Sequence, residues 1–72
     1  MQTIYVYLLN EGTDVWRPVD AVHIAGDSYR IVGNNPNPDD EQWEFTTGQV
    51  VSCEVRELSG GPCLVAVTSA KV

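Results

Sequence analysis

The chain has 72 residues, and its ten acidic and four basic side chains give a net charge of −6. This length predicts one small domain, residues 1–72, and a hydrophobic fraction of 43% supplies enough apolar material for its core. The charge argues against direct binding to DNA, RNA or anionic lipid, because each needs clustered Lys and Arg. It is compatible with a basic protein partner, or with acids that only keep the protein soluble.

The N-terminus and the thiols bear on the compartment. Residues 1–3 carry no basic side chain ahead of the apolar run, and residues 4–9 are too few for the core of a secretory signal. No apolar stretch approaches the roughly 20 residues of a membrane span. Together with free thiols, these features predict a cytoplasmic protein that does not bind membranes.

Short strands separated by turn residues fill the first part of the chain. Residues 4–9 are β-branched, aromatic or aliphatic and predict a strand, and residues 10–14 have turn chemistry. A second strand is expected from Val15 to Ile24. Pro18 cannot donate a ladder hydrogen bond, so we expect its half of that strand to lie at an edge or a bulge.

A hairpin follows, with a tight turn at residues 25–28 and a third strand at residues 29–32. Two cross-strand pairs are expected in it: Ile24 with Tyr29, and Val22 with Ile31. This register sorts those apolar side chains onto one face and leaves His23 and Arg30 on the other.

The second half of the chain continues as strands. Residues 43–45 predict a short strand with its two rings on one side and Glu44 on the other, and residues 46–49 predict a turn. A long strand is expected over residues 50–58. Its apolar face would carry residues that alternate with polar ones: Val51, Cys53 and Val55.

Residues 59–61 predict the turn to a last strand at residues 63–68, and two registers are open. A three-residue loop gives these pairs: Val55 with Val65, and Cys53 with Val67. A two-residue loop gives a different one: Cys63 with Leu58. In neither register do the two cysteines face each other, and they lie beyond the roughly 7 Å that a disulfide can span. Both are expected to be reduced.

Five or six short strands, polar turns and no segment of helical periodicity predict an all-β protein. The expected fold is a small, strongly bent antiparallel barrel or a two-sheet sandwich. The barrel is favoured, because closure protects edges that so short a sheet would otherwise leave open. The run "DVWRPVDAVHIAGDSYRIVG", followed by a loop and "EQWEF", resembles the middle of SH3-like and Tudor-like barrels over about residues 15–55. It is also similar to short bacterial or phage-borne reading frames of unassigned function.

The resemblance implies a non-catalytic interaction module that binds peptides or modified side chains through aromatic residues near its loops. Tudor-type modules hold methylated cations in a cage of rings with a nearby acid. Here the resemblance assigns the cage to these residues: Trp16, Trp43 and Phe45 with Asp39 or Glu41. The competing interpretation is that the rings serve an ordinary core.

No residue pattern predicts catalysis, a metal or a cofactor. His23 is expected on the surface, and neither cysteine lies in an electropositive setting that would activate it. Gly60 and Gly61 belong to a hairpin turn and not to a phosphate loop. Residues 35–41 alternate oxygen ligands, but the EF-hand pattern is absent and prolines stiffen the run. We therefore predict a protein that is not an enzyme and that uses no metal or cofactor.

The leading hypothesis is protein binding by the acidic loop, residues 34–44, together with its flanking tryptophans. The predicted contact residues are Asp39, Asp40, Glu41, Glu44, Trp16 and Trp43. The sequence reveals no structural role for these acids, and Asp14, Asp20 or Glu11 would extend their surface. In its sharper form the hypothesis is an inhibitor that occupies the cationic groove of a nucleic-acid-binding protein. Small acidic anti-CRISPR proteins resemble such a molecule.

Two alternatives belong to other classes. One is a binder of small ligands or modified residues that uses the aromatic cage. The other is an accessory subunit that buries Trp16, or the strand of Tyr5 and Tyr7, in an oligomer. The partner, the host process and the oligomeric state are left open by the sequence.

Overall fold

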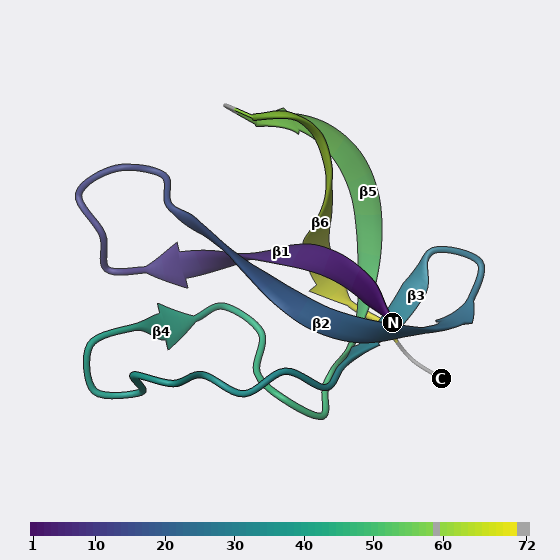
Figure 1. Ribbon diagram of the computed structural model, residues 1–72, viewed down its shortest axis with the longest axis horizontal. Coiled ribbons are helices and arrows are strands. Elements are labelled where there is room, and N and C mark those ends of the chain that lie inside the picture. Colours follow the sequence, from purple (N-terminus) through teal and green to yellow (C-terminus); the bar gives the residue numbers. More distant parts are fainter. Residues whose placement is uncertain (59, 71–72) are drawn as a thin grey trace.

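The computed structural model describes residues 1–58 and 60–70. Throughout those residues the regular structure is strand, in one six-stranded sheet (Figure 1). The strands are β1 (Gln2–Leu9), β2 (Trp16–Ala25), β3 (Ser28–Ile31), β4 (Gln42–Trp43), β5 (Val50–Leu58) and β6 (Gly61–Ser69). The predicted all-β fold is confirmed. In the part of the chain that is described, no helix is long and apolar enough to cross a membrane.

Most of these strands close into a ring, in the order β1, β2, β3, β5, β6 and back to β1. Neighbours that follow one another around the ring are antiparallel, whereas β6 meets β1 in parallel. A ring with an odd number of alternating strands must contain one such parallel pair. The predicted small barrel is therefore confirmed, and its closing seam is the pair of Tyr5 and Val65.

The short strand β4 extends the other edge of β1 where β6 has departed. Leu8 pairs with Trp43, and the backbone N–H of Glu44 donates to the Tyr7 carbonyl oxygen at 2.9 Å. Of the strand predicted at residues 43–45, only Trp43 lies in a strand, and residues 44 and 45 follow its end; the predicted sorting of side chains is confirmed. Trp43 and Phe45 are buried and Glu44 is exposed.

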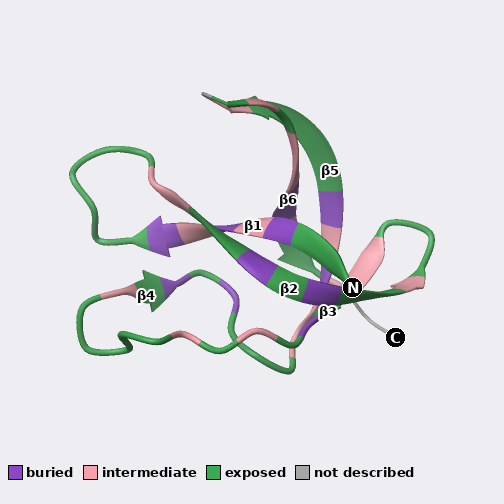
Figure 2. Ribbon diagram, in the orientation of Figure 1, coloured by how far each residue is buried: buried purple, intermediate pink, exposed green. Residues whose placement is uncertain are grey.

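Alternation along β1 separates an inner face from an outer face. Ile4, Val6 and Leu8 are buried inside the barrel, and Tyr5 and Tyr7 between them are half-buried on the opposite side. Figure 2 shows buried segments alternating with exposed ones along β1 and β2. The other buried members of the core cluster are Val19, Ala21, Ile31, Trp43, Phe45, Val51, Cys53 and Ala66.

The hairpin of β2 and β3 forms as predicted but in a different register. The observed pairs near the turn are Ala25 with Ser28 and His23 with Tyr29. Ile24 is therefore the extra residue of a β-bulge, which shifts the pairing of everything beyond it by one position.

That bulge decides which side chains of β2 face the core. The two pairs expected from the sequence, Ile24 with Tyr29 and Val22 with Ile31, are wrong by one position. Ala21 pairs with Ile31 instead, and both are fully buried. Val22 is 42% exposed opposite Arg30. A one-residue slip moves a whole strand segment to the other face, so the predicted sorting failed as a unit.

Pro18 lies where β2 has a neighbouring strand on one side only. Residues 16–20 pair with β1, and pairing with β3 starts beyond them. The Asp20 carbonyl oxygen points away from β1, since it accepts from the N–H groups of Val32 and Gly33, each at 3.0 Å. Residues two apart on a strand direct their backbone groups to the same side, so Pro18 places its missing N–H on the open edge. The predicted edge position is confirmed.

The hairpin of β5 and β6 curves away from the β1–β2 pair (Figure 1). Its observed pairs include Leu58 with Gly61, Arg56 with Cys63, and Cys53 with Ala66. Both predicted registers are therefore wrong. The connection falls at residues 59–60, and Ser59 of the predicted turn lies outside the described residues. Gly61 has a φ of 115°, a backbone conformation that disfavours any residue with a Cβ.

Two consequences of this hairpin concern predicted core residues. Val55 is 68% exposed, so its expected place beside Val51 and Cys53 on the apolar face is wrong. Cys53 and Cys63 are both free, as predicted, and they pair with different residues along the ladder.

Candidate functional site

The loop that the sequence favoured, residues 34–44, is held by its own hydrogen bonds. The Asn35 side chain donates to the Glu41 carbonyl oxygen at 2.7 Å and accepts from the Asn37 N–H at 2.9 Å. The Asn37 carbonyl oxygen in turn accepts from the N–H groups of Asp40 and Glu41. The loop is therefore preorganised, and the exposed side chains of Asp39 and Asp40 project from this turn.

Glu41 has a structural role that its sequence context did not reveal. Its carboxylate forms an ion pair with Arg17 and accepts from the indole N–H of Trp43 at 3.3 Å. The hydrogen bond from Arg17 holds the pKa of Glu41 below its ordinary value of 4.5, although partial burial acts in the opposite direction. The expectation that the loop acids have no structural role is wrong for Glu41, which ties the loop to β2.

Trp16 and Trp43 lie on opposite faces of β1 and cannot form one cage. Trp43 pairs with Leu8 and is only 6% exposed, as part of the core. Trp16 pairs with Tyr7, the neighbour of Leu8, and paired side chains share a face of the sheet. Successive residues of β1 point to opposite faces, so the two indoles are separated by the strand. Phe45, the third ring of the expected cage, is also in the core.

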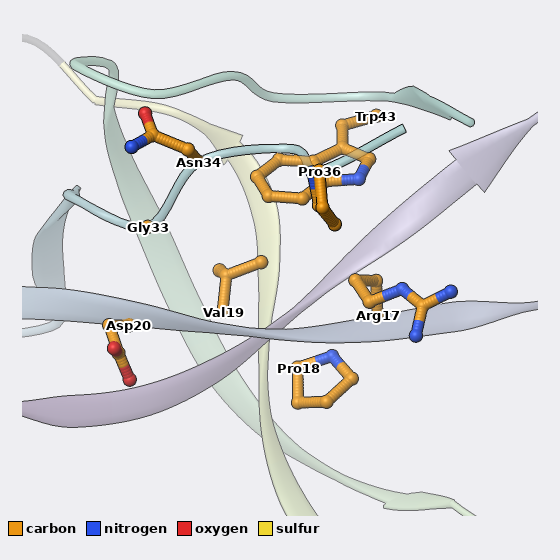
Figure 3. A pocket seen from close by; sticks show the side chains of 8 residues that line it. All are labelled: Arg17, Pro18, Val19, Asp20, Gly33, Asn34, Pro36 and Trp43. Carbon is orange, nitrogen blue, oxygen red and sulfur yellow. The ribbon is translucent and has the colours of Figure 1, made fainter. Parts of the chain in front are cut away.

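A pocket of about 300 Å³ lies between the open edge of β2 and the start of the acidic loop (Figure 3). Val19 points toward the rings of Pro36 and Trp43, whereas Pro18 points to the other side of the strand. The approach of the two backbones is close, because a Cβ on Gly33 would lie 3.1 Å from the Asp20 nitrogen. This pocket lies where the loop packs onto the barrel.

The outer face of β1 carries a different arrangement. The rings of Tyr7 and Trp16 meet edge to face, with centroids 5.2 Å apart and an interplanar angle of 69°. Tyr5 lies two residues along on the same face, and it joins Val65 at the barrel seam. Val65 is fully buried but does not belong to the core cluster inside the barrel. The outer face thus has a packed aromatic layer of its own.

Two pockets border this layer, and both include Asp14 and Trp16. The first, of about 330 Å³, is also lined by Tyr7, Glu44 and Arg56. The second, of about 360 Å³, is also lined by Tyr5, Val15, Leu58 and Cys63. The curved β5–β6 hairpin contributes to both linings, through Arg56 in one pocket and Leu58 in the other. We call this surface the outer aromatic face; it consists of Tyr5, Tyr7, Asp14, Trp16 and Glu44.

Negative charge dominates the outer aromatic face. The Tyr7 hydroxyl donates to the Asp14 carboxylate at 2.9 Å, and this bond, with the charge of Asp14, raises the pKa of Tyr7. Arg56 lines the same pocket, but its guanidinium is paired with Glu54 on its own strand. The remaining charges at the pocket, Asp14 and Glu44, are both acidic.

The contact residues predicted from the sequence are therefore divided. Trp16 and Glu44 meet at the outer aromatic face. Glu41 and Trp43 serve the loop and the core, and Asp39 and Asp40 line neither pocket of that face. The sequence did contain a signal for the outer face, since tyrosines alternate with aliphatic residues in β1. Nothing in the sequence placed the β5–β6 hairpin opposite them.

Two side chains of types that often act in catalysis, His23 and Cys53, have structural contacts in this fold. The exposed His23 packs against Tyr29 and donates from Nε2 to the Gly26 carbonyl oxygen at 2.6 Å. Burial raises the pKa of the Cys53 thiol to about 11, with a further contribution from Asp27, so this thiol is a poor nucleophile. Over the described residues, no group of three or more His, Cys, Asp or Glu side chains is placed to hold a metal ion.

Fold and site together define a small closed β-barrel with an aromatic, acidic face on the outside of its first strand. Comparison of the chain with protein-family models, with curated proteins and with solved structures gives no match in any of the three.

Proposed function

We propose that this protein is a non-enzymatic binding module that holds a basic segment of another protein on its outer aromatic face. The observation that carries the proposal is the Tyr7–Trp16 pair, which lines an open pocket together with the carboxylates of Asp14 and Glu44. Aromatic faces and carboxylates both attract a Lys or Arg side chain, and a partly desolvated site strengthens that attraction.

The overall charge supports the same class of partner. A net charge of −6 on 72 residues creates a field that steers a basic partner toward the module and repels nucleic acid. The preorganised turn that presents Asp39 and Asp40 adds to this field without further ordering on binding. In the sharper form of the proposal, the module is an inhibitor that occupies a basic groove otherwise used for nucleic acid.

Two further parts of the proposal concern class and compartment. The resemblance to SH3-like barrels, whose members bind peptides, is supported by the closed ring of short strands. Action in the cytoplasm is supported by the two free thiols. A cage that combines Trp16 with Trp43 is not part of the proposal, because the two rings lie on opposite faces of β1.

The test begins with selection of random dodecapeptides displayed on phage against the folded protein. We expect the selected sequences to be enriched in Lys and Arg. Two variants then compare the surfaces at equal charge: Asp14→Asn with Glu44→Gln, and Asp39→Asn with Asp40→Asn. Each removes two negative charges with little change of shape, so the long-range field changes equally.

We expect the Asp14/Glu44 variant to weaken binding of a selected peptide by about tenfold or more, because charge-assisted contacts are lost. The Asp39/Asp40 variant should weaken it by only about twofold through the reduced field. Equal weakening by the two variants, or selection of peptides without basic residues, would contradict the proposal. A larger effect of the Asp39/Asp40 variant would move the contact surface to the acidic loop.

A further inference from the structure

Trp16 stands between the two pockets of the outer aromatic face, and their linings differ in chemistry. The pocket that includes Tyr7 and Glu44 combines two aromatic rings with two carboxylates, and Arg56, Ala66 and Val67 complete its lining. The pocket on the other side is lined by apolar side chains, those of Val15 and Leu58 among them. Because Trp16 and Asp14 line both, the two pockets are immediate neighbours.

The acidic pocket suits the charged end of a side chain. Its ring pair and its two carboxylates offer a cation more than one favourable contact, and the charge of Arg56 is paired with that of Glu54. An uncharged apolar group there would remove water from Asp14 and Glu44 without replacing its hydrogen bonds. This pocket therefore discriminates in favour of Lys or Arg.

The neighbouring pocket suits an apolar side chain. Tyr5, Val15, Leu58 and the half-buried thiol of Cys63 line it, and Asp14, at its border with the acidic pocket, is the charged residue among the described lining. Filling this volume with a branched aliphatic group removes apolar surface from water on both partners. A second cation there would have one carboxylate, shared with the first, to accept it.

We propose that the outer aromatic face recognises two neighbouring side chains of its partner: a Lys or Arg in the acidic pocket and an aliphatic residue in the apolar pocket. This inference rests on the proposed function and names the ligand of the same site. An extended peptide directs residues i and i+2 to the same side, so the two recognised residues are separated by one. The face would therefore bind a segment with a basic and an aliphatic residue more tightly than a segment with basic residues alone.

Cys63 provides a reporter that is specific for the apolar pocket. Its half-buried thiol lines that pocket, whereas Cys53 is buried in the core and its raised pKa leaves little thiolate at neutral pH. Iodoacetamide should therefore modify Cys63 before Cys53, and peptide mapping by mass spectrometry separates the two. Protection of Cys63 measures occupancy of the apolar pocket independently of affinity.

Three matched peptides are used, each flanked by glycines and carrying two further lysines: one with Arg-Thr-Leu, one with Arg-Thr-Asn, and one with Gln-Thr-Leu. A fourth peptide carries the reversed order, Leu-Thr-Arg. Whichever of the two orders binds more tightly shows the direction in which the peptide lies on the face. We expect the Arg/Leu peptide to bind about tenfold more tightly than either singly altered peptide. At saturation, the two peptides that carry leucine should slow modification of Cys63 by about fivefold or more, and the Arg-Thr-Asn peptide should not.

Two variants of the protein test the pockets separately. Leu58→Ser alters the apolar pocket at the end of β5, outside the barrel core, and should lower the affinity for the Arg/Leu peptide to that of the Arg/Asn peptide. Its affinity for the Arg/Asn peptide should not change. Glu44→Gln should weaken both peptides alike.

The outcomes separate this inference from the proposed function. If the Arg/Leu and Arg/Asn peptides bind equally and leave Cys63 equally reactive, the apolar subsite is refuted and the basic-segment function stands. If no peptide binds, the proposed function itself is refuted. Equal protection of Cys63 by both would also overturn the inference, since the asparagine peptide has no group for that pocket.

Discussion

The two tryptophans of this protein pair with neighbouring residues of β1, and they have different roles. Trp43 pairs with Leu8 on the inner face, is 6% exposed and donates its indole N–H to Glu41. Trp16 pairs with Tyr7 on the outer face, stays half-buried, and lines two open pockets. One ring closes the end of a small core, and the other is held at the surface by a second aromatic ring.

The comparison shows how a very small barrel can keep large rings at its surface. A chain of this length buries only about 60% of its unfolded surface, so every large side chain left outside lowers the stability available from the core. Tyr5, Tyr7 and Trp16 are retained outside: the rings of Tyr7 and Trp16 meet edge to face, and Tyr5 pairs with Val65 on the neighbouring strand. That retention supports a function for the outer face, because the core gains nothing from it.

The strongest test of the comparison substitutes each tryptophan by alanine. Trp43→Ala leaves a cavity in the core and removes a hydrogen bond, so we expect it to destabilise the fold by about 3–5 kcal/mol. A domain of this size has roughly that much stability, and the variant should be largely unfolded at 25 °C. Trp16→Ala loses mainly the contact with Tyr7 and should cost about 1 kcal/mol. Urea unfolding followed by circular dichroism measures both.

Binding should follow the opposite order in variants that remain folded. Trp43→Phe preserves most of the buried ring and should leave the affinity for a basic peptide unchanged, whereas Trp16→Ala should abolish most of it. Equal destabilisation by Trp43→Ala and Trp16→Ala would mean that both rings belong to the core. The separation of two faces would then be wrong.

The strands and the barrel were accessible from the sequence because they depend on local patterns. The β-branched and aromatic runs located the long strands, and the alternation in β1 separated the inner from the outer face. Pro18 marked an open edge for a reason of covalent chemistry, since it lacks the N–H that a neighbouring strand would need.

The registers and the site were not accessible, because they depend on single extra residues and on distant strands. The bulge at Ile24 shifts β2 against β3, and no composition signal distinguishes it from regular pairing. The ion pair of Glu41 with Arg17 joins residues far apart in the chain, so the acids of the loop looked equivalent when they are not. The apolar pocket likewise depends on the β5–β6 hairpin approaching Trp16.

A third prediction compares an inner and an outer position within one strand, β5. Val51 is fully buried in the barrel, and Val55, four residues on, is 68% exposed where the strand has left it. Val51→Ala removes two buried methyl groups and leaves a small cavity, which should cost about 2 kcal/mol. Val55→Ala should change the free energy of unfolding by less than about 0.5 kcal/mol. A similar loss of stability at the two sites would show that Val55 is buried in solution and would contradict its exposed position.

The smallest expected effect concerns the ion pair of Glu41 with Arg17. Because Arg17 lowers the pKa of Glu41 from its ordinary 4.5, the folded state favours the carboxylate, and this stabilisation is present above that pH. It is lost as the pH falls through the lowered pKa of the folded protein. The melting temperature of the unaltered protein should therefore fall further between about pH 6 and about pH 3 than that of Glu41→Gln, by a few degrees at most. If Glu41→Gln kept the pH dependence of the unaltered protein, the ion pair with Arg17 would contribute nothing in solution, and the Glu41 carboxylate would again be available for binding a partner.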